Sequence, residues 1–429
     1  MKGLLFTYAM TYGGAVVSLI SPYYGFLIYV AFANLKPEAL WFWSVPQGNY
    51  SRIVAVAFLI GWLVHGGGSW KFGRAASMIA ALAFFWAWIT LGAAISPAKD
   101  EAWLSLTTLS KVYLPVIAGV TLIDSVQRLK QLAWVLVATQ GYLALEFNQL
   151  YYAGGIDPMF WSFAGLDNNS IAITMVTSLG LAGFLGLHAE RWWQKLAALV
   201  AAALMAHVVL FSMSRGGMLA MCVTGAVAFW LIPKRPVHFA MLVLAVVVVL
   251  RLAGPEVREE FFTSFADAEV RDASAQSRFD LTRDNIDVML KNPLFGCGMD
   301  NWPNIASSYG WKHGKEGHNL WAQTGAELGI PGLASLLGFY LLGCWNLLKL
   351  TRESTPVADP WIRYCARMVI ASIAGFFVSA AAVSVERVEI PYYIMVLGAG
   401  TLKLYSLGLV PAGSTPQIAD SPPYAAATS

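Results

Sequence analysis

Long apolar runs separated by short polar segments dominate the hydrophobic pattern of this chain. Runs of about 18 or more apolar residues recur, and a helix of that length crosses a hydrocarbon core of about 30 Å. Because lipid offers the backbone no hydrogen-bond partners, spanning segments of this kind are predicted to be helices. Eleven spans are predicted, at about residues 51–66, 76–96, 103–122, 131–150, 169–187, 194–212, 216–232, 237–252, 318–349, 364–383 and 390–407.

Residues 3–34 are also apolar, but the sequence Ser-Pro-Tyr-Tyr-Gly at 21–25 interrupts them. This segment predicts either one kinked span or a hairpin, and the pattern leaves both open. With it, the chain is expected to form an all-α, polytopic membrane bundle of about 12 spans.

One sizeable polar segment, residues 253–317, divides the spans into two groups. It is too charged for lipid and too long for a simple connector. Ser277–Lys291 within it predicts an amphipathic helix that ends before Asn292 and Pro293, with Phe279, Ile286, Met289 and Leu290 on its apolar face. The expected organisation is a transmembrane bundle (1–252), this loop (253–317), C-terminal transmembrane helices (318–408) and a disordered, cytoplasmic tail (409–429).

Composition and charge agree with a membrane protein. The chain is 57% hydrophobic and 12% charged, whereas soluble domains carry about 25% charged residues. Lys and Arg fall in or beside alternate loops, which places those loops in the cytoplasm and the 253–317 loop outside. The chain shows no nucleic-acid motif, metal-ligand spacing, Walker loop or dinucleotide fingerprint, so neither a cofactor nor a metal nor a nucleic acid is expected.

His318 lies where the long loop re-enters an apolar helix. An unperturbed histidine titrates near pH ~6.5, so it can accept a proton from an acceptor hydroxyl as a general base. The alternative is an interfacial histidine that merely opens a helix.

Arg215 lies at a tight turn between two spans, followed by Gly216 and Gly217. The loop parity places this turn outside, against the usual cytoplasmic bias of arginine. A guanidinium group suits a pyrophosphate, and the two glycines allow close backbone approach. A snorkelling surface arginine is the alternative reading.

Two further cations are candidates for substrate binding. Arg278 opens the expected loop helix, and Arg283 projects elsewhere; by pattern alone both are solvated helix charges. Lys111 lies inside the 103–122 span, where a lysine either serves function or snorkels outward.

Other polar and small residues near these sites are expected to be structural. Asp167, Asn168 and Asn169 are expected to cap the following span, with a sugar contact as the lesser alternative. Gly329 pairs with Gly325 in a small-xxx-small pattern that favours close helix packing, and Gly332 follows a proline that can kink the helix. His313, Lys312 and Lys315 are expected on the loop surface, where they could add positive potential near the site.

The pair His318–Asn319, followed after nine residues by Gly329-Ile330-Pro331-Gly332, resembles the motif of the bacterial O-antigen ligase and polymerase superfamily. The segments SPYYG (21–25), NLKPE (34–38) and DNN (167–169) resemble the subgroup of O-glycosylation ligases associated with exosortase systems. The resemblance covers most of the chain, but it does not separate ligases from polymerases.

This resemblance implies a fold of the GT-C type and a metal-independent glycosyltransferase at the periplasmic face of the bacterial inner membrane. Its donor would be a glycan on undecaprenyl pyrophosphate, and its acceptor a hydroxyl of lipid A core, a protein or another saccharide. By this resemblance His318 takes the position of the base, and Arg215 and Arg278 take the positions that bind the pyrophosphate. Lys111 and Asn319 are expected to be further substrate contacts. The alternatives are a polysaccharide polymerase with the same donor and a non-catalytic transporter of lipid-linked sugars.

Overall fold

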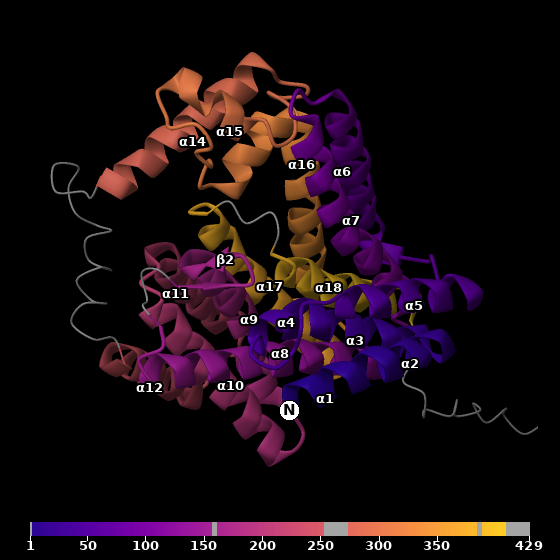
Figure 1. Ribbon diagram of the computed structural model, residues 1–429. Coiled ribbons are helices and arrows are strands. Elements are labelled where there is room, and N and C mark those ends of the chain that lie inside the picture. Colours follow the sequence, from indigo (N-terminus) through magenta and orange to yellow (C-terminus); the bar gives the residue numbers. More distant parts are fainter. Residues whose placement is uncertain (1, 157–160, 253–272, 384–387, 409–429) are drawn as a thin grey trace, which may run out of the picture.

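The computed structural model describes residues 2–156, 161–252, 273–383 and 388–408, and the described part is almost entirely helical (Figure 1). The helices are α1 (Lys2–Tyr8), α2 (Gly14–Ile20), α3 (Pro22–Leu35), α4 (Pro37–Leu40), α5 (Tyr50–Val64), α6 (Ala76–Ile95), α7 (Lys99–Leu122), α8 (Val126–Tyr152), α9 (Asn168–His188), α10 (Trp192–Phe211), α11 (Arg215–Leu231), α12 (Pro236–Leu252), α14 (Ala273–Lys291), α15 (Trp302–Ile305), α16 (Leu320–Leu348), α17 (Pro360–Ala380) and α18 (Ile390–Leu407). A short antiparallel hairpin pairs β1 (Ser162–Phe163) with β2 (Leu166–Asp167).

Seven helices in the described part of the chain are long and apolar enough to cross a membrane, and three shorter apolar helices accompany them. The chain is therefore a polytopic, all-α membrane protein, as predicted. The expected span 390–407 coincides with α18, whereas α7 begins four residues before its expected start, at Lys99. That extra turn, Lys99-Asp100-Glu101-Ala102, is polar enough to escape a hydrophobicity criterion but remains helical.

The N-terminal segment forms a hairpin, which decides the alternative that the pattern left open. Gly14 on α2 lies against Ile28 on α3, and Gly25 lies against Ser18, so the two arms run antiparallel. A Cβ at Gly25 would approach the Ser18 side chain to 2.5 Å, so the close crossing needs glycine at this position.

Helix α16 runs from one end of the bundle to the other and defines its two sides. The end at Leu320 lies beside α14 and α15 and is called the loop side below (Figure 1). The end at Leu348 leads into the turn before α17 and is called the basic side.

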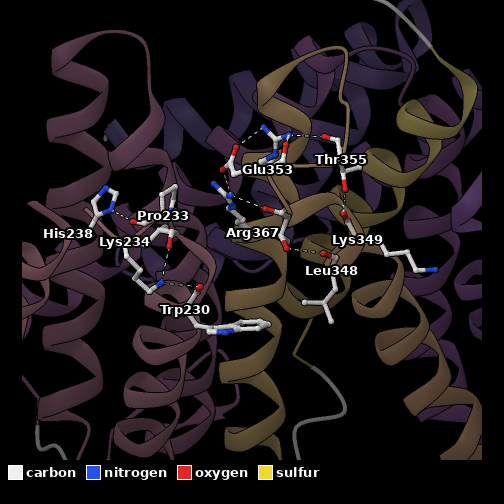
Figure 2. A network of polar contacts seen from close by, with 12 residues as sticks. Trp230, Pro233, Lys234, His238, Leu348, Lys349, Glu353, Thr355 and Arg367 are labelled. Atoms are coloured by element: carbon white, nitrogen blue, oxygen red, sulfur yellow. Dashed lines mark hydrogen bonds and ion pairs between the residues drawn. The ribbon is translucent and has the colours of Figure 1, made fainter. Parts of the chain in front are cut away.

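Charged residues on the basic side are paired with protein acceptors (Figure 2). Arg367, only 3% exposed, donates to Glu353 at 2.7 Å and to the Thr351 carbonyl at 2.8 Å. Arg363 shares the same carboxylate at 3.3 Å, and Lys234 donates to the last carbonyls of α11. This network fixes the turn between α16 and α17 and closes an exposed helix end.

On the loop side, α14 ends at Lys291 as predicted but begins four residues earlier than expected. Its buried face carries Leu281, Asn285 and Val288, whereas Phe279 and Ile286 of the expected apolar face are exposed. The expected face was wrong because α14 packs on α15 and α16, in a small core with Trp302, Ala306 and Ala326. The residues at i, i+4 and i+7 from Leu281 meet that core.

Candidate functional site

A break in α16 brings the segment after α14 against the helix. Gly329 has φ 67° and ψ −171°, which interrupts the helical backbone, and Ile330 N donates to the Pro293 carbonyl at 2.8 Å. A Cβ at Gly329 would lie 2.3 Å from the Leu294 carbonyl oxygen. Glycine is therefore required here both for the left-handed backbone and for the close approach.

A second contact joins the same segment to the helix one turn before the break. Cys297 N donates to the Ala326 carbonyl at 2.7 Å, and the Glu327 carboxylate accepts from Asp300 N at 3.1 Å. After the break, a Cβ at Gly332 would lie 2.4 Å from the Leu328 Cβ, so this position also needs a small residue. These contacts fix the polar loop relative to the start of α16.

His318 lies two residues before α16 in a left-handed backbone conformation, with φ 51°. Non-glycine residues rarely adopt this conformation, and such strain concentrates at functional sites. Leu320 N donates to the Val383 carbonyl at 3.2 Å, so the segment after α17 holds the chain just beyond the histidine.

Asn319 caps α16 and also reaches toward α14. Its Oδ1 accepts from the backbone N–H groups of Trp321 and Ala322, and its Nδ2 donates to Thr282 Oγ1 at 3.4 Å. Thr282 in turn donates to the Arg278 carbonyl at 2.8 Å. Asn319 thus sets the position of α14 and of Arg278 relative to His318.

The half-buried imidazole of His318 lies in a positive environment. Burial, together with the charges of Lys315 and Arg278, lowers the pKa of His318 to about 4, and Asp167 opposes this shift. Desolvation disfavours the imidazolium, and two nearby cations disfavour it further. The side chain is neutral at pH 7 and can accept a proton.

Arg215 begins α11 at a turn that is tied to Asp167 and its neighbours. Ser214 Oγ caps α11 by accepting from Gly217 N at 3.2 Å, and it donates to Asn169 Oδ1 at 2.8 Å. Asp167 caps α9 by accepting from Ser170 N at 2.8 Å, as expected for this run.

The other side of this turn meets the segment that holds the start of α16. A Cβ at Gly216 would lie 2.8 Å from the Ala382 Cβ, and Ala382 precedes the Val383 carbonyl that accepts from Leu320. At Gly217 an added Cβ would lie 2.8 Å from the Ala172 Cβ of α9. Both glycines therefore allow the close packing that brings the Arg215 turn beside the His318 segment.

Lys111 lies elsewhere. It is exposed on α7, and its carbonyl accepts from the Tyr29 hydroxyl at 2.6 Å. The main contacts of α7 are with α3, α5, α6 and α18, none of which carries a residue of the His318 cluster. A substrate contact for Lys111 stays a prediction, and the structure does not bring Lys111 together with the other candidates.

An apolar groove runs between α8 and α10, with a volume of about 730 Å³. Leu145, Val200 and Leu204 line it, and Tyr152 and His207 stand where both helices end on the loop side. The turn that carries Arg215 follows directly after α10. The groove therefore offers an apolar surface that leads toward that turn.

Sequence reasoning missed two charged neighbours of His318. Asp167 was expected as a helix cap, with a sugar contact as the lesser alternative, and Lys315 as a loop-surface residue that could add positive potential near the site. Both charges are visible in the sequence, but Asp167 precedes His318 by 151 positions, and its approach to the imidazole depends on the packing of α9. Among the described residues no group of three or more His, Cys, Asp or Glu side chains could hold a metal ion.

Residues 200–337 match the family model described as O-antigen ligase. The matched region contains Arg215, Arg278, His318, Asn319 and Gly329, whereas Asp167 and Lys111 precede it. No curated protein matches the chain.

Proposed function

We propose that this multi-pass membrane protein, whose residues 200–337 match the O-antigen ligase family model, transfers a glycan from undecaprenyl pyrophosphate to an acceptor hydroxyl. The family implies a lipid-linked glycan donor and a bilayer. The proposed location of the reaction is the periplasmic face of the bacterial inner membrane. The observation that carries this proposal is the neutral, strained His318 beside Arg278, within the matched domain.

The proposed reaction is a single displacement. His318 takes the proton of the acceptor hydroxyl while that oxygen bonds to the anomeric carbon of the donor sugar. The bond from this carbon to the pyrophosphate oxygen breaks with its electron pair, and polyprenyl pyrophosphate leaves. One displacement of this kind inverts the anomeric centre.

Arg278 and Arg215 are proposed to hold the pyrophosphate. Guanidinium groups bind phosphate oxygens in a bidentate manner and stabilise the charge that grows on the leaving group. Arg278 is supported by its electrostatic proximity to His318, and Arg215 by the packing of its turn on the segments around Asp167 and Val383.

Donor binding is proposed to strengthen the base. In the free protein the charges of Arg278 and Lys315 lower the pKa of His318. A pyrophosphate bound to these cations offsets their charge, and it therefore raises the affinity of His318 for a proton. The histidine becomes the stronger base only when the donor is present.

The groove between α8 and α10 is proposed to hold the polyprenyl tail. Its apolar walls suit isoprenoid units, and it leads toward the turn of Arg215. Replacing Ala203, a wall residue, with Trp should raise the KM for a long-chain donor more than for a short-chain donor. Equal effects on both chain lengths would remove the groove from the proposal.

Purified protein supplied with lipid-linked donor and candidate acceptors tests the proposed reaction. His318→Ala is expected to lower transfer by about 10²–10⁴-fold, the range of general-base catalysis. His313→Ala is the matched control, because His313 is an exposed histidine five residues earlier on the same loop. Equal activity of the two variants would contradict the proposed base.

The identity of the product separates the ligase from its relatives. Glycan joined to a lipid, protein or soluble saccharide acceptor supports the ligase. Glycan added to a second lipid-linked chain would identify a polymerase instead. Movement of intact donor across the bilayer without any transfer would identify a transporter.

A further inference from the structure

A small cavity of about 30 Å³, with a mainly apolar wall that includes several polar side chains, lies between α3, α8, α9 and the start of α18, beside the β1–β2 hairpin. The side chains of Asn34, Lys36, Gln140, Thr174 and Glu389 contribute to its lining. A cavity of about 10–15 Å³ already holds one water molecule, so this one has room for a small polar group. Polar residues inside a membrane bundle are costly, and their convergence indicates function.

The deepest of these groups has an unused hydrogen-bond acceptor. Gln140 is only 2% exposed, and its Nε2 donates to Asn34 Oδ1 at 3.4 Å. Its Oε1 is buried and has no hydrogen-bond partner among the described residues. A buried acceptor without a partner is destabilising, so a ligand that donates an O–H or N–H to it would gain that hydrogen bond.

Two aromatic rings line the cavity beside the β1–β2 hairpin, which leads to Asp167. Gln140, Leu143 and Phe147 occupy successive turns of α8, and Phe147 packs edge-on against Phe163 of the hairpin at 5.1 Å. Leu166 of the same hairpin lines the cavity, and the next residue is Asp167, whose charge acts on His318. The cavity is therefore linked to the proposed reaction centre through the hairpin that carries Asp167.

We propose that this cavity is a saccharide subsite, in which a hydroxyl or acetamido substituent of a sugar donates a hydrogen bond to Gln140 Oε1. Asn34 and Glu389 supply further acceptors, Lys36 supplies a donor, and the aromatic rings pack on the apolar face of the sugar. The volume suits one substituent, with the sugar ring at the mouth. This subsite rests on the proposed function, and it gives the reaction a means to select its glycan.

The test compares two lipids on purified His318→Ala protein, in which no transfer consumes them. One is the lipid-linked glycan extracted from the cells that make the protein, and the other is undecaprenyl pyrophosphate without sugar. The glycan-bearing lipid should bind more tightly. Gln140→Met should remove roughly fivefold to tenfold of that difference and leave the binding of the sugar-free lipid unchanged.

Thermal unfolding separates a binding role from a structural one. Gln140→Met keeps the side-chain volume and removes an unsatisfied acceptor, but it also removes the long 3.4 Å hydrogen bond to Asn34 Oδ1, so its Tm should stay near that of the parent. Thr224→Val is the matched control, because Thr224 Oγ1 is also buried without a partner but lies on α11, outside the cavity. The Thr224→Val variant should keep or raise the Tm and leave the sugar-dependent affinity intact.

A second variant and a second saccharide source complete the experiment. Leu143→Phe fills the cavity from its wall without changing a polar group, and it should also weaken the sugar-dependent binding. Soluble oligosaccharides released from the surface polysaccharide of the same cells test whether the subsite serves the acceptor. Binding of these soluble oligosaccharides, without sugar-dependent binding of the lipid-linked glycan, would assign the subsite to the acceptor.

The outcomes separate this subsite from the proposed function. Sugar-dependent binding that needs Gln140, together with no transfer by the protein that keeps His318, would support the subsite and contradict the ligase. Transfer by a protein whose sugar-dependent binding ignores Gln140 and Leu143 would overturn the subsite alone. No sugar-dependent binding in either arm would overturn the subsite and identify the cavity as a water site.

Discussion

The two sides of the bundle use their cations in different ways. On the basic side Arg363 and Arg367 share the carboxylate of Glu353 and bind nearby carbonyls (Figure 2). On the loop side the charges of Lys315 and Arg278 act on one neutral histidine, and Asp167 opposes them. The first arrangement holds a turn in place, whereas the second favours the binding of an anion.

Reversing the charge of Arg278 on the loop side is expected to have the largest effect on glycan transfer. Arg278→Glu should lower transfer by about 10²-fold or more, because it replaces a pyrophosphate-binding cation with a repelling anion. Transfer is compared per folded molecule, because the half-buried Arg278 also has an interaction within the protein. Transfer assays and thermal unfolding on the same preparation check this.

Arg283→Glu is the matched control for that variant, because Arg283 is exposed on the same helix and five residues away. An equal loss of transfer in both variants would show a general effect of net charge, and the proposed role of Arg278 would fail.

Arg215→Lys should also abolish most of the transfer. A lysine keeps the charge but cannot form the bidentate contact of a guanidinium group. Because the fold around the turn depends on Ser214 and the two following glycines, the variant should keep its Tm. Full activity with lysine would mean that only charge is needed at this position.

Gly329→Ala should destabilise the protein by about 3 kcal/mol or more. The added Cβ meets the Leu294 carbonyl oxygen, and the left-handed backbone is strained for alanine. Gly183→Ala, at a helical glycine with open space around it, is the control and should be neutral or slightly stabilising. Denaturation in detergent measures both.

A substitution on the basic side should change the stability of the protein and not its transfer activity. Glu353→Gln removes the carboxylate shared by two arginines, one of which is buried, and should cost about 1–3 kcal/mol. Transfer per folded molecule should stay near that of the parent. A large loss of turnover at unchanged stability would contradict the division between the two sides.

Stability should fall in mild acid because of His318. Its folded pKa of about 4 lies below the ordinary value near 6.5, so the unfolded chain binds more protons between these values. The contribution of His318 to the free energy of unfolding is therefore full above pH ~6.5 and declines as the pH falls toward 4. His318→Ala should make acid unfolding less steep in this window.

Local patterns in the sequence predicted the spans well because lipid demands long apolar helices. The N-terminal hairpin could not be decided, since Pro22 fits a kink as well as a turn, and the Gly25–Ser18 contact exists only in three dimensions. The face of α14 was assigned from its own apolar residues, but Trp302 on a separate helix decides which of them are buried.

For the site, the motif around His318 pointed to a base, and resemblance pointed to Arg278. The sequence could not show that Asp167 acts on the same imidazole as Lys315, because Asp167 lies 151 residues before His318 in the chain. Gln140 was hidden within an apolar span, and only packing shows that it lines a cavity and that its amide oxygen is buried without a hydrogen-bond partner among the described residues.

Titration of His318 by NMR, with the imidazole isotope-labelled, tests the central claim most directly. In the free protein the pKa should be about 4, and saturating undecaprenyl pyrophosphate should raise it, because the ligand offsets the charges of Arg278 and Lys315. A pKa near 6.5 that does not respond to the ligand would contradict the account, since the histidine would then lie outside the site that binds the donor.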